Sequence, residues 1–168
     1  LFGTGKYFEK SDSDYLATTV PRVESFYGVV DDGTANLIRY MLVTQSFNGE
    51  RYNEARNFRH SSQNSVNYRS GDWGWVIDLE VETNRRGEKV FTAPVIDDNR
   101  VYFASQVPGR GDYCSGVARA YFNVLDWRDG SQLQEEVLDI NGDGEVDDYD
   151  SQLASAGIDS HQLDASLI

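Results

Sequence analysis

The chain has 168 residues, a formal net charge of −13 and 39% hydrophobic residues. This length suits one domain or part of a larger one, and the acidic balance speaks against nucleic acid as a partner, because phosphate binding needs a basic surface. No apolar run reaches the roughly 18 residues of a membrane-spanning helix, and no signal peptide is visible. The single cysteine, Cys114, excludes a disulfide within the chain.

Short strand-like runs dominate the first part of the chain. Residues 1–8 alternate apolar side chains with Gly and Thr, residues 25–33 end in an Asp-Asp-Gly turn, and residues 36–47 form a third run. Residues 48–71 are polar and lose this periodicity, so we expect a long loop or insertion there. That polar loop holds much of the positive charge of this half: Arg51, Arg56, Arg59 and Arg69.

Strand signals resume at residues 73–81. Residues 88–105 form the clearest predicted hairpin, because β-rich runs flank Asp97-Asp98-Asn99, whose residue types tolerate left-handed turn geometry. Residues 119–133 predict another strand, closed by a turn at Asp129-Gly130. We expect the three tryptophans to pack between sheets, with stacking on a sugar as the alternative for an exposed pair: Trp73, Trp75 and Trp127.

Regularly spaced short strands with turn signals predict an all-β fold, either a sandwich, a barrel or a propeller. The order of strands and turns is typical of the antiparallel blades of a β-propeller, and about two blades fit into this length. Two blades cannot close a ring, so we interpret residues 1–168 as a fragment of a larger C-terminal propeller domain. We also expect the parent protein to carry a signal peptide, since the chain opens on Leu1.

The most specific pattern is the acidic loop, residues 139–150, in which six of twelve side chains are carboxylates. Oxygen ligands at positions 1, 3, 5, 7, 9 and 12, with Gly at position 6, are the pattern of an EF-hand-like calcium loop. Gly144 holds that sixth position. The predicted ligands of a Ca²⁺ ion are Asp139, Asn141, Asp143, Glu145 through its backbone carbonyl, Asp147 and Asp150.

The twelfth position carries Asp150, whose arm is shorter than that of the usual Glu. Either Asp150 binds as in dockerin-type loops, or Asp147 closes a nine-residue loop. We expect Val146 to turn inward and anchor the loop, and a short helix to follow and end at Gly157. The alternatives are an acidic turn without an ion and a magnesium site, although Mg²⁺ demands a tighter octahedron. A structural role for the ion is expected over a switching role.

The remaining motifs give weaker evidence for a function. Arg110-Gly111-Asp112 is the tripeptide that integrin-type receptors read, and a chance occurrence in a turn is the main alternative. His60 and His161 are isolated, without a metal-binding partner at a suitable spacing. No catalytic triad, paired-carboxylate frame or cofactor fingerprint stands out, so the sequence predicts no enzyme.

Several stretches, in this order along the chain, resemble the C-terminal β-propeller of the type IV pilus assembly and tip-adhesin family, PilC/PilY. These stretches are residues 1–8, 25–33, 58–80, 85–116, 120–133 and 138–148. Ser115-Gly116-Val117-Ala118 departs from the family pattern, which usually shows a second Gly after Cys114. The family's larger N-terminal region is absent from this sequence, so the resemblance implies nothing about adhesive specificity.

The resemblance implies an exported protein at the cell surface, on the pilus tip, or at the outer membrane or periplasm. Its implied partners are pilins and minor pilins, the missing remainder of the same protein, and host surface receptors. Its implied roles are pilus extension, twitching motility and surface attachment. It also implies calcium binding in an Asp-rich loop, at Asp139, Asn141, Asp143 and Asp147. The competing readings are a quinoprotein-like propeller enzyme and a dockerin-like docking module.

Overall fold

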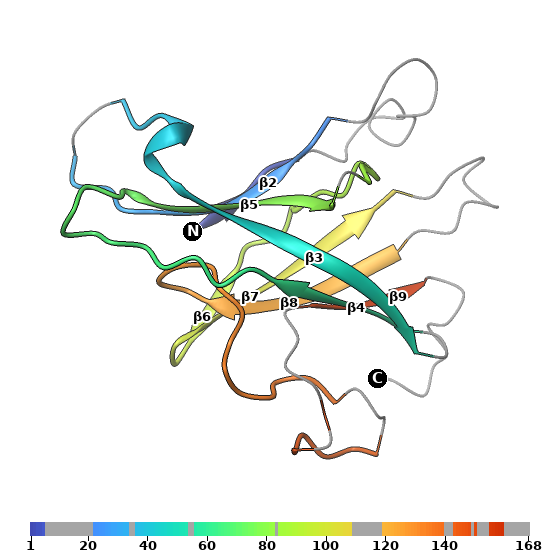
Figure 1. Ribbon diagram of the computed structural model, residues 1–168. Coiled ribbons are helices and arrows are strands. Elements are labelled where there is room, and N and C mark those ends of the chain that lie inside the picture. Colours follow the sequence, from blue (N-terminus) through green and yellow to red (C-terminus); the bar gives the residue numbers. More distant parts are fainter. Residues whose placement is uncertain are drawn as a thin grey trace.

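The computed structural model describes residues 1–5, 22–33, 36–53, 56–82, 84–108, 119–139, 143–148, 150 and 155–159. They form one nine-stranded sheet in the order β1-β2-β5-β3-β4-β9-β8-β7-β6, in which only β3 and β5 pair in parallel (Figure 1). The strands are β1 (Phe2–Gly3), β2 (Ser25–Val29), β3 (Val43–Asn53), β4 (Arg56–Ser61), β5 (Gly74–Val81), β6 (Val95–Asp97), β7 (Arg100–Val107), β8 (Arg119–Asp126) and β9 (Ser155–Asp159).

The described residues contain one short 3₁₀ helix, Arg39–Met41, beside these strands. The expected all-β class is therefore confirmed. None of the helical residues in the described ranges forms a segment long and apolar enough to cross a bilayer.

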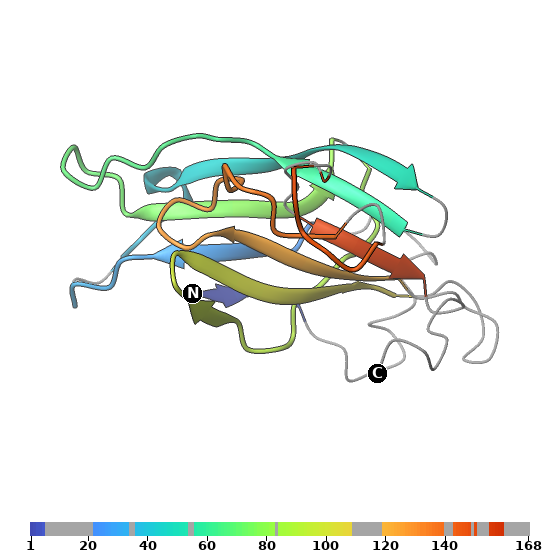
Figure 2. The ribbon, with the colours of Figure 1, turned by 90° about the horizontal axis from the view of Figure 1, so that it is seen from below.

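The hydrophobic core joins the two ends of this strand order. Figure 2 shows β3 and β4 on one side of the molecule and β7 and β8 on the other. The Phe26 ring of β2 stacks on the Phe103 ring of β7, with centroids 3.9 Å apart. Burying a large apolar side chain contributes about 1.5–3 kcal/mol, so this shared core holds the sheet in its bent form. Its buried members are Phe26, Phe47, Trp75, Ile77, Leu79, Val81, Val90, Val101, Phe103 and Leu125.

Trp75 on β5 is the largest side chain of the core and is 0% exposed. A Cβ atom at Gly130 would lie 2.2 Å from the Trp75 ring, and Gly130 has a φ of 71°. Both the space and the left-handed backbone therefore require glycine in the turn after β8. Trp75 packs as the sequence predicts, whereas Trp73 is half-buried and Trp127 is 40% exposed.

The predicted polar loop at residues 48–71 is wrong for its first part. β3 continues to Asn53, and β4 covers residues 56–61. β4 lies between β3 and β9, and its neighbouring residues Phe58 and Arg59 are 2% and 0% exposed. Successive residues of a strand point to opposite faces, so both faces of β4 are buried. Because one of these buried residues is an arginine, the sequence shows no alternation of apolar and polar residues. Residues 62–73 do lie outside the strands.

The helix expected after the acidic loop is also wrong at its far end. Gly157, the predicted stop, lies inside β9, which pairs with β4 and β8 in antiparallel fashion. Two flanking strands satisfy the backbone groups of this segment better than an isolated helical turn would. The predicted hairpin is confirmed as β6 and β7, and Asp98 takes the left-handed turn position with a φ of 52°.

Candidate functional site

The acidic loop is curled on itself. The Asp139 Oδ2 atom accepts a hydrogen bond from the Gly144 amide at 3.1 Å, which draws the first predicted ligand position across to the sixth. Gly144 has a φ of 91°, the left-handed conformation that a sharp turn at this position needs. The Asp143 Oδ1 atom accepts a hydrogen bond from the Glu145 amide at 2.9 Å, so a second carboxylate folds back over the loop.

The two candidates for the closing ligand lie together. The Asp150 Oδ2 atom accepts a hydrogen bond from the Asp147 amide at 3.1 Å, and the Asp150 amide donates to the Asp147 carbonyl at 2.9 Å. Asp150 is 5% exposed, whereas Asp143 and Glu145 are exposed. The last residue of the loop is therefore buried, whereas the middle of the loop is open to solvent.

The donor chemistry of this loop fits calcium, because carboxylate oxygens on a curled loop are the ligands that this hard ion prefers. Asn141 lies outside the described residues. Within the described part of the chain, no three His, Cys, Asp or Glu side chains gather closely enough to hold a metal. The calcium site thus stays a prediction.

Val146 does not anchor the loop. Its side chain is 52% exposed, contrary to the prediction that it turns inward. The described loop contacts run through carboxylates and backbone amides, so no apolar anchor is needed at this position. Arg110-Gly111-Asp112, Cys114 and His161 lie outside the described residues, and His60 is half-buried on β4.

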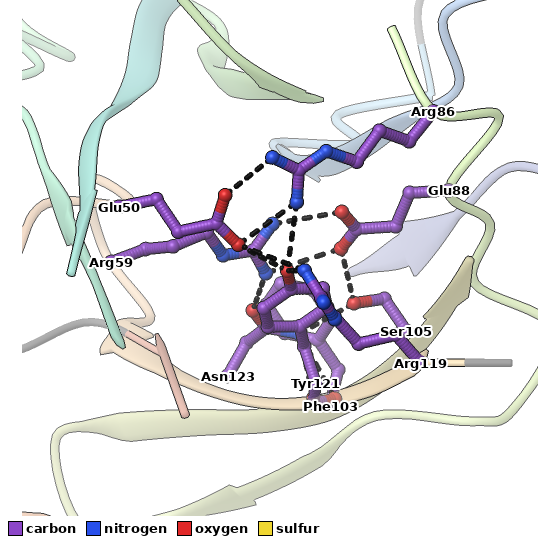
Figure 3. A network of polar contacts seen from close by, with 9 residues as sticks. All are labelled: Glu50, Arg59, Arg86, Glu88, Phe103, Ser105, Arg119, Tyr121 and Asn123. Atoms are coloured by element: carbon purple, nitrogen blue, oxygen red, sulfur yellow. Dashed lines mark hydrogen bonds and ion pairs between the residues drawn. The ribbon is translucent and has the colours of Figure 1, made fainter. Parts of the chain in front are cut away.

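A second charged region, which we call the buried ionic network, lies inside the sheet (Figure 3). Its centre is the guanidinium of Arg59, which lies between the rings of Phe47 and Tyr121 at 4.0 and 3.7 Å from their centroids. Arg59 Nη1 donates to Glu88 Oε2 at 2.8 Å, and Arg59 Nη2 donates to Asn123 Oδ1 at 2.8 Å. Paired charges and cation–π contacts compensate the cost of removing this cation from water.

The Glu88 carboxylate is held from a second side. Its side chain is 3% exposed, and its Oε1 atom accepts a short hydrogen bond from the Ser105 hydroxyl on β7. The Asn123 amide nitrogen donates to the same hydroxyl oxygen at 3.0 Å. The ion pair is therefore built into a closed hydrogen-bonded ring that joins β4, β7, β8 and the segment between β5 and β6.

The outer part of the buried ionic network centres on Glu50. Its carboxylate accepts hydrogen bonds from Arg86 and from the Tyr121 hydroxyl, the latter at 2.6 Å, and Arg119 lies at 3.4 Å. Burial by itself would raise the pKa of Glu50, but the Arg86 and Tyr121 hydrogen bonds outweigh it, so the pKa lies below the ordinary value. Burial raises the pKa of the Tyr121 hydroxyl, which stays protonated and donates.

Each carboxylate of this network is paired with at least one guanidinium from a distant part of the chain. The network therefore holds these segments together. Sequence reasoning missed it and placed Arg59 in a solvated loop. No local pattern could have identified it, since the partners of Arg59 are 29 and 64 residues away in the chain.

Known proteins resemble the chain in both sequence and fold. It is 28% identical over 164 residues to the type IV pilus biogenesis factor PilY1 of Pseudomonas aeruginosa, covering 88% of this chain and 14% of that protein. It is 26% identical over 138 residues to a PilY1 homolog of Xylella fastidiosa, covering 81% and 9%. The crystal structure of the P. aeruginosa PilY1 C-terminal domain matches with a TM-score of 0.73 at 25% identity, over 94% of this chain and 35% of that one. No family model matches the chain. The chain spans only a small part of the length of these relatives.

Proposed function

Because the chain belongs to the PilC/PilY family and shares the β-propeller-like fold of its C-terminal domain, we propose that it acts in type IV pilus biogenesis. The observation that carries this proposal is the fold match over 94% of the chain, together with the sequence similarity over 88%. In this proposal the protein is exported to the cell surface or the pilus and works with pilins and minor pilins. It supports pilus extension, twitching motility and surface attachment.

A replacement experiment tests the pilus role. The segment of P. aeruginosa PilY1 that matches this chain is exchanged for it, and surface pili and twitching zones are compared with those of wild type and of a segment deletion. We expect pilus numbers well above those of the deletion strain. Numbers equal to the deletion strain, with the chimeric protein present at normal level, contradict the proposed role.

We further propose that the acidic loop binds one calcium ion through Asp139, Asn141 and Asp143, with Asp147 or Asp150 closing the site. The curled backbone and the alternating carboxylates support this, because the like charges of an empty loop repel one another. When bound, the ion supplies the positive charge that holds these oxygens together. The strand at Ser155–Asp159 weakens the alternative of a dockerin-like module, whose helix was expected to reach Gly157.

Calorimetric titration of Ca²⁺ into the chain tests the calcium site. The Asp139→Ala, Asp143→Ala double variant is compared with wild type, and Glu82→Ala, Asp97→Ala serves as a control that removes two exposed carboxylates elsewhere. We expect the binding heat to vanish in the loop variant and to persist in the control. Equal heats in all three proteins would remove calcium from the loop.

A further inference from the structure

Two clefts adjoin the turn after β8, residues 127–130. The polar cleft has a volume of about 560 Å³, and its lining includes Gln63, Asn99, Asp126, Asp129, Gln134 and Glu135. The apolar cleft has a volume of about 370 Å³ and is lined by Leu1, Val29, Val30, Tyr68, Ile96 and Trp127. Arg128 lines both clefts, so they are neighbours across one side chain. Both volumes lie in the range of about 300–1,000 Å³ that small-molecule sites occupy.

The turn between the clefts is fixed by side chains from other segments. Trp75 Nε1 donates to the Trp127 carbonyl at 3.1 Å, and Gln45 Nε2 donates to the Asp129 carbonyl at 2.7 Å. The Tyr68 hydroxyl donates to the Arg128 carbonyl between them. In Figure 1 this turn is the orange loop after β8, close to the green segment that follows β4. A surface that is already ordered loses little conformational entropy on binding a ligand.

Three carboxylates and one arginine line the polar cleft, and two of these carboxylates are paired with arginines. Asp126 pairs with Arg128 at 2.7 Å, and Glu135 pairs with Arg100 at 2.6 Å. Asp129, the third carboxylate, accepts a hydrogen bond from the Ser131 amide at 3.0 Å. The excess of negative charge disfavours an anionic ligand. Within the described ranges these carboxylates also do not gather into a metal site. A neutral ligand with many hydroxyl groups suits this lining best.

The apolar cleft offers exposed aromatic rings on which the apolar part of such a ligand can lie. Trp127 is 40% exposed and Tyr68 is 45% exposed, although large aromatic side chains usually bury most of their surface. A sugar ring has apolar C–H groups on its face and hydroxyl groups at its edge. It can therefore lie on an aromatic ring while its hydroxyls bond to amides and carboxylates, which are the two kinds of surface that meet here.

We propose that the two clefts together form a binding site for a neutral carbohydrate of at least two sugar units. One ring lies on Trp127 in the apolar cleft. The next places its hydroxyls in the polar cleft, where Asp129 accepts hydrogen bonds and the amides of Gln63 and Asn99 donate and accept them. The proposal goes beyond the proposed pilus function and does not involve the acidic loop.

The test uses the 168-residue chain and a panel of neutral probes: glucose, galactose, mannose, N-acetylglucosamine, lactose, cellobiose and chitobiose. Binding is measured by tryptophan fluorescence and by saturation-transfer NMR. We expect at least one disaccharide to bind with a Kd of about 1 mM or lower, and more tightly than its monosaccharide. Failure of every probe to bind by about 10 mM overturns the proposal.

Variants locate the site. Asp129→Asn keeps an oxygen for the Ser131 amide but removes the charge, so we expect a loss of about tenfold in affinity with the fold intact. Trp127→Ala should lose at least as much, and Trp127→Phe less, because a smaller aromatic ring remains. Gln63 is exposed, so Gln63→Ala should leave the fold intact. It removes one amide from the polar cleft and should therefore weaken saccharide binding. Asp97→Asn makes the same charge change outside the clefts and should bind like wild type.

Three results would contradict the site. The first is unchanged affinity in Asp129→Asn, Trp127→Ala and Gln63→Ala. The second is binding of sulfated or uronic-acid saccharides in place of the neutral ones, which would make the cleft an anion site. The third is loss of saccharide binding when the chain is part of the PilY1 chimera. Such a loss would show that the rest of the protein covers the aromatic surface.

Discussion

The two charged regions of the molecule are built in opposite ways. The acidic loop gathers charges of one sign from a single short stretch of sequence, and its described carboxylates hold its own backbone amides. The buried ionic network gathers charges of both signs from segments far apart, and its central cation, Arg59, lies between two aromatic rings. The network pairs its carboxylates with arginines of the same chain, whereas the loop is the region where we propose that an outside ion binds. One charged region is therefore suited to stability, and the other is the candidate for binding.

The largest effect is expected at the centre of the buried ionic network. Arg59→Met leaves the Glu88 carboxylate buried without its cation, so the free energy of unfolding should fall by about 3–5 kcal/mol. Arg59→Met combined with Glu88→Leu removes both charges and should recover much of this loss. Urea denaturation of wild type, Arg59→Met, Glu88→Leu and the double variant measures the coupling. A double variant at least as unstable as the sum of the single variants would show that the pair is not coupled.

The acidic loop should respond to its ion by an intermediate amount. If calcium binds only the folded chain, a concentration 100 times the Kd raises the free energy of unfolding by about 2.7 kcal/mol. Thermal denaturation with calcium and with a chelator measures this gain. Asp139→Ala, Asp143→Ala should show no gain, whereas Arg59→Met should keep it, because the two regions are separate. A gain that survives in the loop variant would place the ion elsewhere.

A smaller effect is expected from pH at Glu50. Its folded pKa is lowered, so its stabilisation is present above the ordinary value of 4.5 and is lost as the pH falls through the folded value. Glu50→Gln should cost about 1–3 kcal/mol near neutral pH and much less in acid. The free energy of unfolding of both proteins is measured from pH 7 down to pH 3. The difference between wild type and variant should shrink as the pH falls. A difference that stays constant with pH would exclude ionisation as its source.

The smallest effect is expected at Val146. Because its side chain is 52% exposed, Val146→Ala should change the free energy of unfolding by less than about 0.5 kcal/mol. Val76→Ala on β5, where the side chain is 0% exposed, provides the matched control and should cost about 1–3 kcal/mol. Equal losses at the two positions would show that Val146 packs against the core.

The strands that sequence reasoning predicted are those with apolar runs or clear turns. β5 contains Trp75, Val76 and Ile77 in succession, and the β6–β7 hairpin turns at Asp98, so both were accessible to pattern reasoning. β4 and β9 were missed because their strand character comes from flanking partners and not from their own side chains. Pairing between distant segments overrides weak local preference in such strands.

The same distinction holds for the sites. The acidic loop could be predicted as a calcium site because all its expected ligands lie within residues 139–150, at a spacing that suits calcium. The buried ionic network and the two clefts could not be identified, since their residues meet only after the sheet bends. Arg59 and Trp127 illustrate both errors: a charged residue expected in solvent is buried, and a tryptophan expected in the core is exposed.

A crystal structure of the chain grown with calcium is the decisive experiment for the proposed ion site in the acidic loop. We expect one anomalous-scattering peak inside the loop, with oxygens of Asp139, Asn141 and Asp143 at about 2.3–2.6 Å from it. An acidic loop without such a peak, in crystals that hold calcium at another place, would contradict it.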